Sequence, residues 1–210
     1  MNSLEGVMVV GLTGQTGSGK TTVCDVFVRN GFSVINADMV AREVVQKGMP
    51  CLNELADMFG SGIIGQNGEL DRRRLGSIVF ADKSKLEILN SICYPYIASE
   101  ILERIRCFSE NGNKLILLDA PTLFESRTDD FCELIISVIA KMENRVQRII
   151  KRDGISENEA LNRINSQHDE EFFVANSDFV IKNNKDLNNL NIVTQEVVDK
   201  VKDYYNKKIK

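Results

Sequence analysis

The 210-residue sequence has little of several features that direct chains to other classes of protein. It has only three prolines and no low-complexity tract, which argues against long linkers. Its longest apolar runs fall far short of the roughly 20 residues that span a membrane. Residues 1–6 contain an acid and no basic cluster, unlike a signal peptide. At this length we expect one domain, 1–210, or one core with an inserted lobe, and no membrane partner.

Cysteine and histidine usage narrows the class further. Five cysteines, at positions 24, 51, 93, 107 and 132, are widely spaced and form no C-x-x-C pair. This usage is typical of a reduced, cytoplasmic protein without structural zinc. The single histidine, His168, stands among acidic residues and is expected to be a solvated surface residue. The formal net charge of −4 disfavours a nucleic-acid partner, so a phosphate ligand would have to be bound by local basic clusters.

The most informative stretch is residues 14–21, Gly-Gln-Thr-Gly-Ser-Gly-Lys-Thr, which fits G-x-x-x-x-G-K-[ST] in full. An apolar run that predicts a buried strand precedes it and a helix-forming run follows, a context that disfavours a chance glycine turn. Glycines let backbone N–H groups surround a phosphate, and the helix N-terminus adds its positive dipole end. We therefore expect a nucleoside triphosphate, with Lys20 on its β and γ phosphates and the Thr21 hydroxyl on Mg²⁺. The predicted nucleotide-binding residues of this segment are Gly14, Thr16, Gly17, Ser18, Gly19, Lys20, Thr21 and Thr22.

Alternating strand and helix patterns predict an α/β fold, a parallel sheet of about five strands covered by helices. Strands are expected at 7–12, 32–36, 114–119, 134–140 and 179–181. Helices are expected at 20–30, 39–46, 143–152, 156–167 and 187–205, the fourth opened by a capping box from Ser156 to Glu159.

Between about 50 and 110 the pattern changes, and helical periodicity dominates. The runs that look helical there are 52–59, 71–80, 83–92 and 95–108. We read this stretch as a helical substrate lobe inserted into a core of residues 6–48 and 112–208. The segment 143–170 is predicted to form a helical lid.

Two aspartates follow predicted strands, at the edge where open parallel sheets bind ligands. Asp38 could take a proton from an attacking hydroxyl or reach Mg²⁺ through water, or it could cap the helix expected at Met39. The sequence leaves these alternatives open. Asp119 ends an apolar strand in the Walker-B pattern, which favours a metal-linked carboxylate over a plain turn residue.

A third constellation is Arg145, Arg148 and Arg152, spaced i, i+3 and i+7. This spacing places all three on one face of a predicted helix, with Val146 and Ile149 toward the other. Like charges along one stripe are unfavourable unless an anion meets them. Together with a triphosphate site, the spacing favours a phosphate-facing lid over a solvated basic face.

With these residues in place, the chain resembles the dephospho-coenzyme A kinase family of the P-loop nucleotide-kinase group, from about Val9 to Asn183. The segments that carry the resemblance are 11–14, 35–38, 59–60, 67–72, 79–80, 89–90, Pro95, 119–125, Arg148 with Arg152, Gln167 and 177–183. The chain departs from the family where Tyr94 stands for the usual histidine and Arg145 for the usual glutamine.

The resemblance implies ATP-dependent phosphorylation of the ribose 3′-hydroxyl of dephospho-coenzyme A, the last step of coenzyme A biosynthesis. It implies a catalytic set of Asp38, as base on that hydroxyl, with Lys20, Arg148 and Arg152. Asn183 and Arg148 would also contact ATP, and Thr21 and Asp119 would hold Mg²⁺. The implied substrate-binding residues are Asp38, Arg72, Tyr94, Pro95, Pro121, Leu123 and Glu125. We expect a monomer or weak homo-oligomer in the cytoplasm, with the helical lobe holding the pantetheine end.

Three other functions fit parts of the sequence. A different small-molecule or nucleotide kinase shares the loop and lid, but the helical lobe is large for a nucleoside monophosphate site. A GTPase-type switch is disfavoured because the nearest run to its guanine motif, Asn-Asn-Lys-Asp at 183–186, has the wrong order. A nucleotide-binding scaffold without turnover is disfavoured by the presence of Lys20, Thr21 and Asp38.

Overall fold

The computed structural model describes residues 6–209, which form two compact units. The core unit consists of the described residues up to Ile35 together with those from Phe108 onward. The helical unit is the contiguous segment Asn36–Cys107. It includes the helix that follows the second strand, and so begins before the lobe boundary expected near residue 50.

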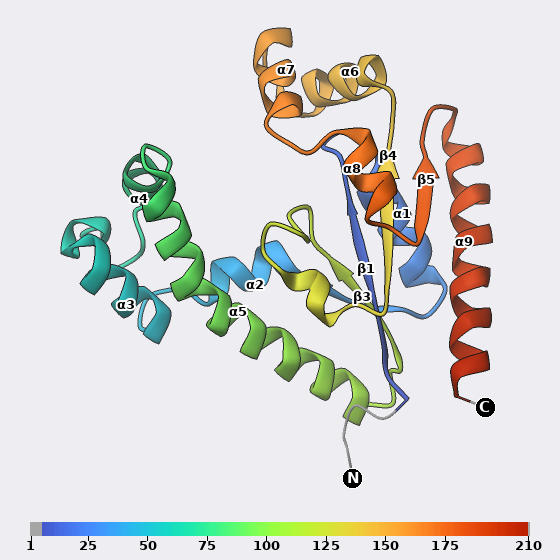
Figure 1. Ribbon diagram of the computed structural model, residues 1–210, viewed down its shortest axis with the longest axis horizontal. Coiled ribbons are helices and arrows are strands. Elements are labelled where there is room, and N and C mark those ends of the chain that lie inside the picture. The colour runs from blue at the N-terminus through green and yellow to red at the C-terminus, as the bar shows by residue number, and fades with distance from the viewer. Residues whose placement is uncertain (1–5, 210) are drawn as a thin grey trace. The chain divides into compact units, whose positions relative to one another are not determined.

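The core unit is built on a five-stranded sheet of order β2-β3-β1-β4-β5 (Figure 1). The strands are β1 (Met8–Gly14), β2 (Ser33–Asn36), β3 (Leu115–Asp119), β4 (Leu134–Ile139) and β5 (Phe179–Lys182). β1 is central and pairs in parallel with β3 and β4, and β4 pairs in parallel with β5. The predicted parallel α/β sheet is confirmed.

Every residue of β1 is buried, because helices pack on the sheet and leave no solvated face there. One side chain cluster joins α1 (Lys20–Arg29) and α9 (Leu187–Lys208) to the sheet, with Phe27, Val198 and Leu12 among its members. Figure 1 shows α9 running alongside β5. This packing fixes the start of α1 at the carboxyl end of β1, where the glycine loop lies.

Three further helices of the core unit form the predicted lid segment. They are α6 (Met142–Asp153), α7 (Glu157–Asn165) and α8 (Glu170–Ala175). The capping box is confirmed, since Ser156 accepts from the Glu159 N–H and Glu159 reaches back to Ser156. The sequence did not predict α8, whose six residues are too few for a periodic signal and which begins at the Asp169 cap.

The helical unit contains α2 (Ala37–Glu43), α3 (Pro50–Phe59), α4 (Arg72–Val79) and most of α5 (Lys83–Glu110). The prediction of two helices at 83–92 and 95–108 is wrong, because α5 is one 28-residue helix with Pro95 inside it. Proline removes a single backbone hydrogen bond and crowds the preceding turn, a local cost that the long helix on both sides tolerates. Arg104 of α5 pairs with Glu43 and Glu100, which ties α2 to α5 within this unit.

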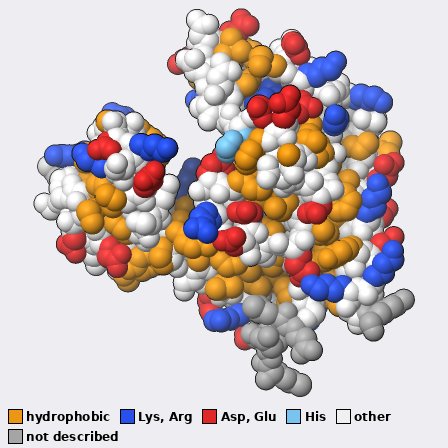
Figure 2. Space-filling view, viewed as in Figure 1, with side chains coloured by type: hydrophobic (Ala, Val, Ile, Leu, Met, Phe, Trp, Pro, Cys, Tyr) orange, Lys and Arg blue, Asp and Glu red, His pale blue; other side chains and the backbone are white. Residues whose placement is uncertain are grey.

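Basic and acidic side chains are intermingled over the visible surface in Figure 2, as the small net charge suggests. Within residues 6–209, each helix is too short or too polar to cross a membrane.

Candidate functional site

The site begins where β1 ends and the glycine loop turns into α1. Gly14 has φ +146°, and a Cβ there would lie 2.2 Å from the carbonyl oxygen of Val138, so only glycine fits beside β4. The backbone N–H of Gln15 donates to the same oxygen at 3.1 Å. Gly19 is the N-cap of α1 and supplies no side-chain cap, which leaves the first amides of the helix available to an anion.

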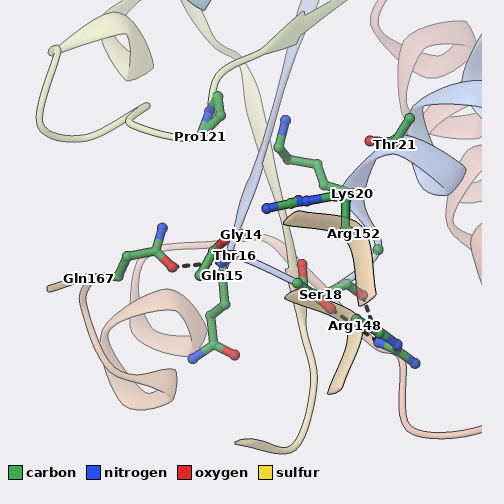
Figure 3. A pocket seen from close by; sticks show the side chains of 12 residues that line it. Gly14, Gln15, Thr16, Ser18, Lys20, Thr21, Pro121, Arg148, Arg152 and Gln167 are labelled. Carbon is green, nitrogen blue, oxygen red and sulfur yellow. Dashed lines mark hydrogen bonds between the residues drawn. The ribbon is translucent and has the colours of Figure 1, made fainter. Parts of the chain in front are cut away.

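A cavity of about 420 Å³ lies over this loop in the core unit (Figure 3). Loop and helix residues line one side of it, and residues from three other segments complete it. The lining residues are Gly14, Gln15, Thr16, Gly17, Ser18, Gly19, Lys20, Thr21, Pro121, Arg148, Arg152 and Gln167. Of the predicted nucleotide-binding residues in the loop, all but Thr22 therefore face one cavity.

Lys20, the first residue of α1, forms an ion pair with Asp119 at the carboxyl end of β3. Both side chains are largely buried, with 16% and 12% of their surface exposed. The pair holds the lysine at the cavity wall and the carboxylate beside it. An ammonium group in this place has the chemistry to stabilise charge on a phosphoryl group.

Oxygen donors for a metal are present at the same place. The Thr21 side chain lies in the exposed first turn of α1, and the Asp119 carboxylate ends β3. Residues 6–209 contain no cluster of three or more His, Cys, Asp or Glu that could hold a metal by itself. Two oxygen donors next to a phosphate-binding loop fit a hard divalent cation that takes its other ligands from phosphates and water.

Arg148 is hydrogen-bonded to the glycine loop and to Asn183, the residue that follows β5. Its Nη1 donates to the carbonyl oxygen of Gly17 at 3.3 Å, and its Nη2 donates to that of Asn183 at 3.3 Å. The Asn183 side chain in turn donates to the Ser18 carbonyl at 2.7 Å. Arg152 lines the cavity and forms a two-bond ion pair with Asp153.

The sequence predicted that Arg145, Arg148 and Arg152 share one basic face of a helix, and this prediction is wrong for Arg145. Arg145 is only 4% exposed and packs with Val146 and Ile149 on the buried side of α6. Its Nε donates to the Thr16 carbonyl at 3.0 Å. The helix approaches the loop at Gly17, where an added Cβ would lie 2.9 Å from the Arg145 carbonyl oxygen. Periodicity alone does not reveal such an approach, so the spacing misplaced this side chain.

Gln167 is a site residue that residue chemistry did not single out. It lies between α7 and α8, and its side-chain oxygen accepts the Thr16 N–H at 2.6 Å (Figure 3). A lone glutamine in a polar segment gives no signal for a contact across 151 residues. Only its match to the resembled family pointed to it.

The segment after β3 divides into exposed and buried residues. Pro121 lines the cavity, and its carbonyl oxygen accepts the Thr13 hydroxyl at 3.3 Å. Leu123, predicted to bind substrate, is a fully buried core residue against Gly11. Glu125 is exposed, with its carboxylate 3.6 Å from His168. His168 is itself exposed, as predicted.

The other predicted acceptor residues belong to the helical unit. Asp38 is exposed in the first turn of α2, and the cap of that helix is Asn36, whose side chain accepts the Met39 N–H at 2.9 Å. The capping alternative for Asp38 is therefore wrong. Arg72 opens α4, and Tyr94 adjoins Pro95 inside α5.

The glycine loop lies between the central parallel strand β1 and the helix α1, and Lys20 and Asp119 pair beside it. This fold and this site are those of a P-loop phosphotransferase. The family model described as Dephospho-CoA kinase matches residues 8–189. The chain belongs to the dephospho-CoA kinase family.

Individual relatives agree with this assignment. The dephospho-CoA kinase of Oryza sativa subsp. japonica is 40% identical over 193 residues, 92% of this chain and 84% of the relative. The crystal structure of TT1252 from Thermus thermophilus matches with a TM-score of 0.78 and 29% identity, covering 92% of this chain and 97% of its own. Dephospho-CoA kinase from Campylobacter jejuni matches with a TM-score of 0.61 and 26% identity, covering 93% and 98%.

Proposed function

We propose that the chain transfers the γ-phosphoryl group of ATP to the ribose 3′-hydroxyl of dephospho-coenzyme A, giving coenzyme A and ADP. The observation that carries this function is the phosphate-loop cavity in a chain that belongs to the dephospho-CoA kinase family over residues 8–189. The reaction is the last step of coenzyme A biosynthesis. The five cysteines, none of them in a C-x-x-C pair, support a reducing, cytoplasmic setting.

Phosphoryl transfer depends on positioning and on charge stabilisation, and the cavity residues are suited to both. The amides of Gly17, Gly19, Lys20 and Thr21 are the proposed donors to phosphate oxygens, since those of Gln15, Thr16 and Ser18 donate within the chain. Lys20 exchanges Asp119 for the β and γ phosphates, while Arg148 and Arg152 approach the phosphates from α6. Arg148 keeps Asn183 and the loop together on the nucleotide side.

Mg²⁺ is the proposed metal, held by the Thr21 hydroxyl and by Asp119, directly or through water. When bound, it neutralises phosphate charge and orients the γ-phosphoryl group. Release of Asp119 from Lys20 would free both groups for their ligands. This exchange is supported by the position of Lys20, which lines the cavity where the phosphates would bind.

The helical unit is proposed to bind the acceptor, and its Asp38 to take the proton of the 3′-hydroxyl. Asp38 has the required chemistry, since its carboxylate is exposed and is not used as the helix cap. A cavity of about 440 Å³ in this unit is lined in part by Arg42, Lys47 and Arg72, cations that suit an acceptor carrying phosphates. Tyr94 and Pro95 are proposed acceptor contacts.

The proposed base is tested by Asp38→Asn, with Asp57→Asn on the exposed side of α3 as the matched control. The amide keeps the size of the side chain but cannot accept the proton, so kcat should fall roughly 10²–10⁴-fold with little change in the KM for ATP. The control should retain wild-type kinetics. A kcat of Asp38→Asn close to wild type would show that another group takes the proton.

The acceptor is tested by comparing dephospho-coenzyme A with AMP and adenosine. Contacts to the remote pantetheine arm help to position the hydroxyl, so truncated acceptors should lose kcat as well as affinity. Product identity is read by mass and by the phosphorus spectrum. A higher kcat/KM for AMP or adenosine would replace the proposed function by a general nucleotide kinase.

A further inference from the structure

Two buried side-chain polar atoms of the described residues have no hydrogen-bond partner, and both belong to the glycine loop or to the helix packed on it. They are Ser18 Oγ and Arg145 Nη2. Buried polar groups nearly always have a hydrogen-bond partner. Two buried polar atoms without one at the same place therefore indicate a partner that the chain itself does not supply. Of the two, the arginine carries a full charge.

The guanidinium of Arg145 reaches the loop from α6, and Arg145 is not among the residues that line the cavity. Its Nε bond to the Thr16 carbonyl, 3.0 Å long, accounts for one of its five donors. Among residues 6–209 no carboxylate lies within the 4.0 Å that defines an ion pair with it. Glu170 is near enough only to act on it through space.

Such a charge is unfavourable in the ligand-free chain. Burial lowers the pKa of Arg145, with Glu170 acting in the opposite direction, yet an arginine stays protonated at neutral pH. Removing a charge from water without pairing it is costly.

We propose that Arg145 is an affinity-determining residue of the phosphate loop, whose buried charge is balanced by the polyphosphate of the bound nucleotide. It destabilises the ligand-free chain and strengthens the binding of highly charged nucleotides over AMP. This inference rests on the proposed nucleotide site but not on the identity of the acceptor.

Arg145→Gln separates the charge from the hydrogen bond. Gln Nε2 is as many bonds from the backbone as Arg Nε, so the variant can keep the donor to the Thr16 carbonyl while it removes the charge and the orphan Nη2. Arg145→Met removes the donor as well. Arg29→Gln, on the exposed end of α1, makes the same change of net charge away from the loop.

Binding of ATP, inorganic pyrophosphate and AMP is measured by calorimetry without acceptor, and the melting temperature is measured with and without ATP. For Arg145→Gln we expect an unchanged or higher ligand-free melting temperature and about tenfold weaker binding of ATP and pyrophosphate, with a smaller change for AMP. The ATP-induced rise in melting temperature shrinks accordingly. Arg145→Met should bind ATP no better than Arg145→Gln, and Arg29→Gln should match the wild type.

Two results would overturn the inference. If Arg145→Gln melts at a lower temperature without ligand and binds ATP as the wild type does, Arg145 is a structural clamp. If Arg145→Gln binds ATP and AMP more weakly by the same factor, the buried charge does not interact with the polyphosphate. A wild-type chain that shows the expected binding pattern but leaves dephospho-coenzyme A unphosphorylated would refute the proposed acceptor alone.

Discussion

Replacing Gly17 by alanine tests how closely α6 packs on the phosphate loop. Gly17 has φ +76°, a left-handed conformation that costs an L-residue roughly 1–2 kcal/mol. The added Cβ would lie 2.9 Å from the carbonyl oxygen and 3.2 Å from the Cα of Arg145, and 3.1 Å from Cγ1 of Ile149. Two of these neighbours are backbone atoms, so the contact is relieved only by moving the helix.

The overlap should add roughly 1–3 kcal/mol, the usual range for overpacking a tight contact. With the conformational term, Gly17→Ala should lose about 2–5 kcal/mol of unfolding free energy. For a chain of this size each kcal/mol corresponds to about 2–4 °C in melting temperature. Loss of the loop geometry should also weaken ATP binding.

Gly154→Ala is the matched control, because Gly154 has φ +66° and open space around the position of a Cβ. Gly154→Ala has the same cost of a left-handed conformation and the same effect on the unfolded chain, but its Cβ overlaps no neighbouring atom. Denaturant unfolding of both variants without nucleotide measures the difference. If Gly17→Ala is no less stable than Gly154→Ala, the close approach of α6 to the loop is refuted.

Two further predictions concern Gln167 in the core unit and cysteines in both units. Gln167→Ala removes the acceptor of the Thr16 N–H and should raise the KM for ATP several-fold. An unchanged KM and kcat would show that this hydrogen bond does not contribute to ATP binding. Alkylation at pH 8, followed by peptide mass, should label the exposed Cys107 first. Burial raises the pKa of Cys24 to about 11 and that of Cys132 to about 12, so at pH 8 these two thiols should react slowly. Their rate of labelling should increase as the pH approaches those values. Equal labelling of all three cysteines at pH 8 would contradict the burial described.

Local features were predicted well from the sequence, because each depends on residues close together in the chain. The loop of residues 14–21, the five strands and the capping box at Ser156 are all of this kind. Asp119 was placed correctly at a strand end, and its pairing with Lys20 follows from the adjacency of β3 and β1.

Errors arose where tertiary contacts decide. Pro95 suggested a break, but the flanking helix continues through it. Arg145 was expected to share a phosphate-facing side of its helix with Arg148 and Arg152, but its side chain is buried and donates to the Thr16 carbonyl. The contact made by Gln167 has no local signature. The sequence left open whether Asp38 caps α2, because Asn36 and Asp38 are both good caps two residues apart, and the structure has Asn36 as the cap.

The central position of β1 has a consequence for how the chain is made. At about 5–20 residues per second, a ribosome releases Leu115, the partner of Met8, on the order of 5–20 s after β1 itself. During that time β1 is an apolar strand with both edges free, which favours aggregation. The contiguous helical unit, Asn36–Cys107, can form its own contacts meanwhile. Because Gly14 and Gln15 are held by Val138 of β4, a nascent chain that ends before β4 carries the phosphate-loop sequence without the means to fix its shape.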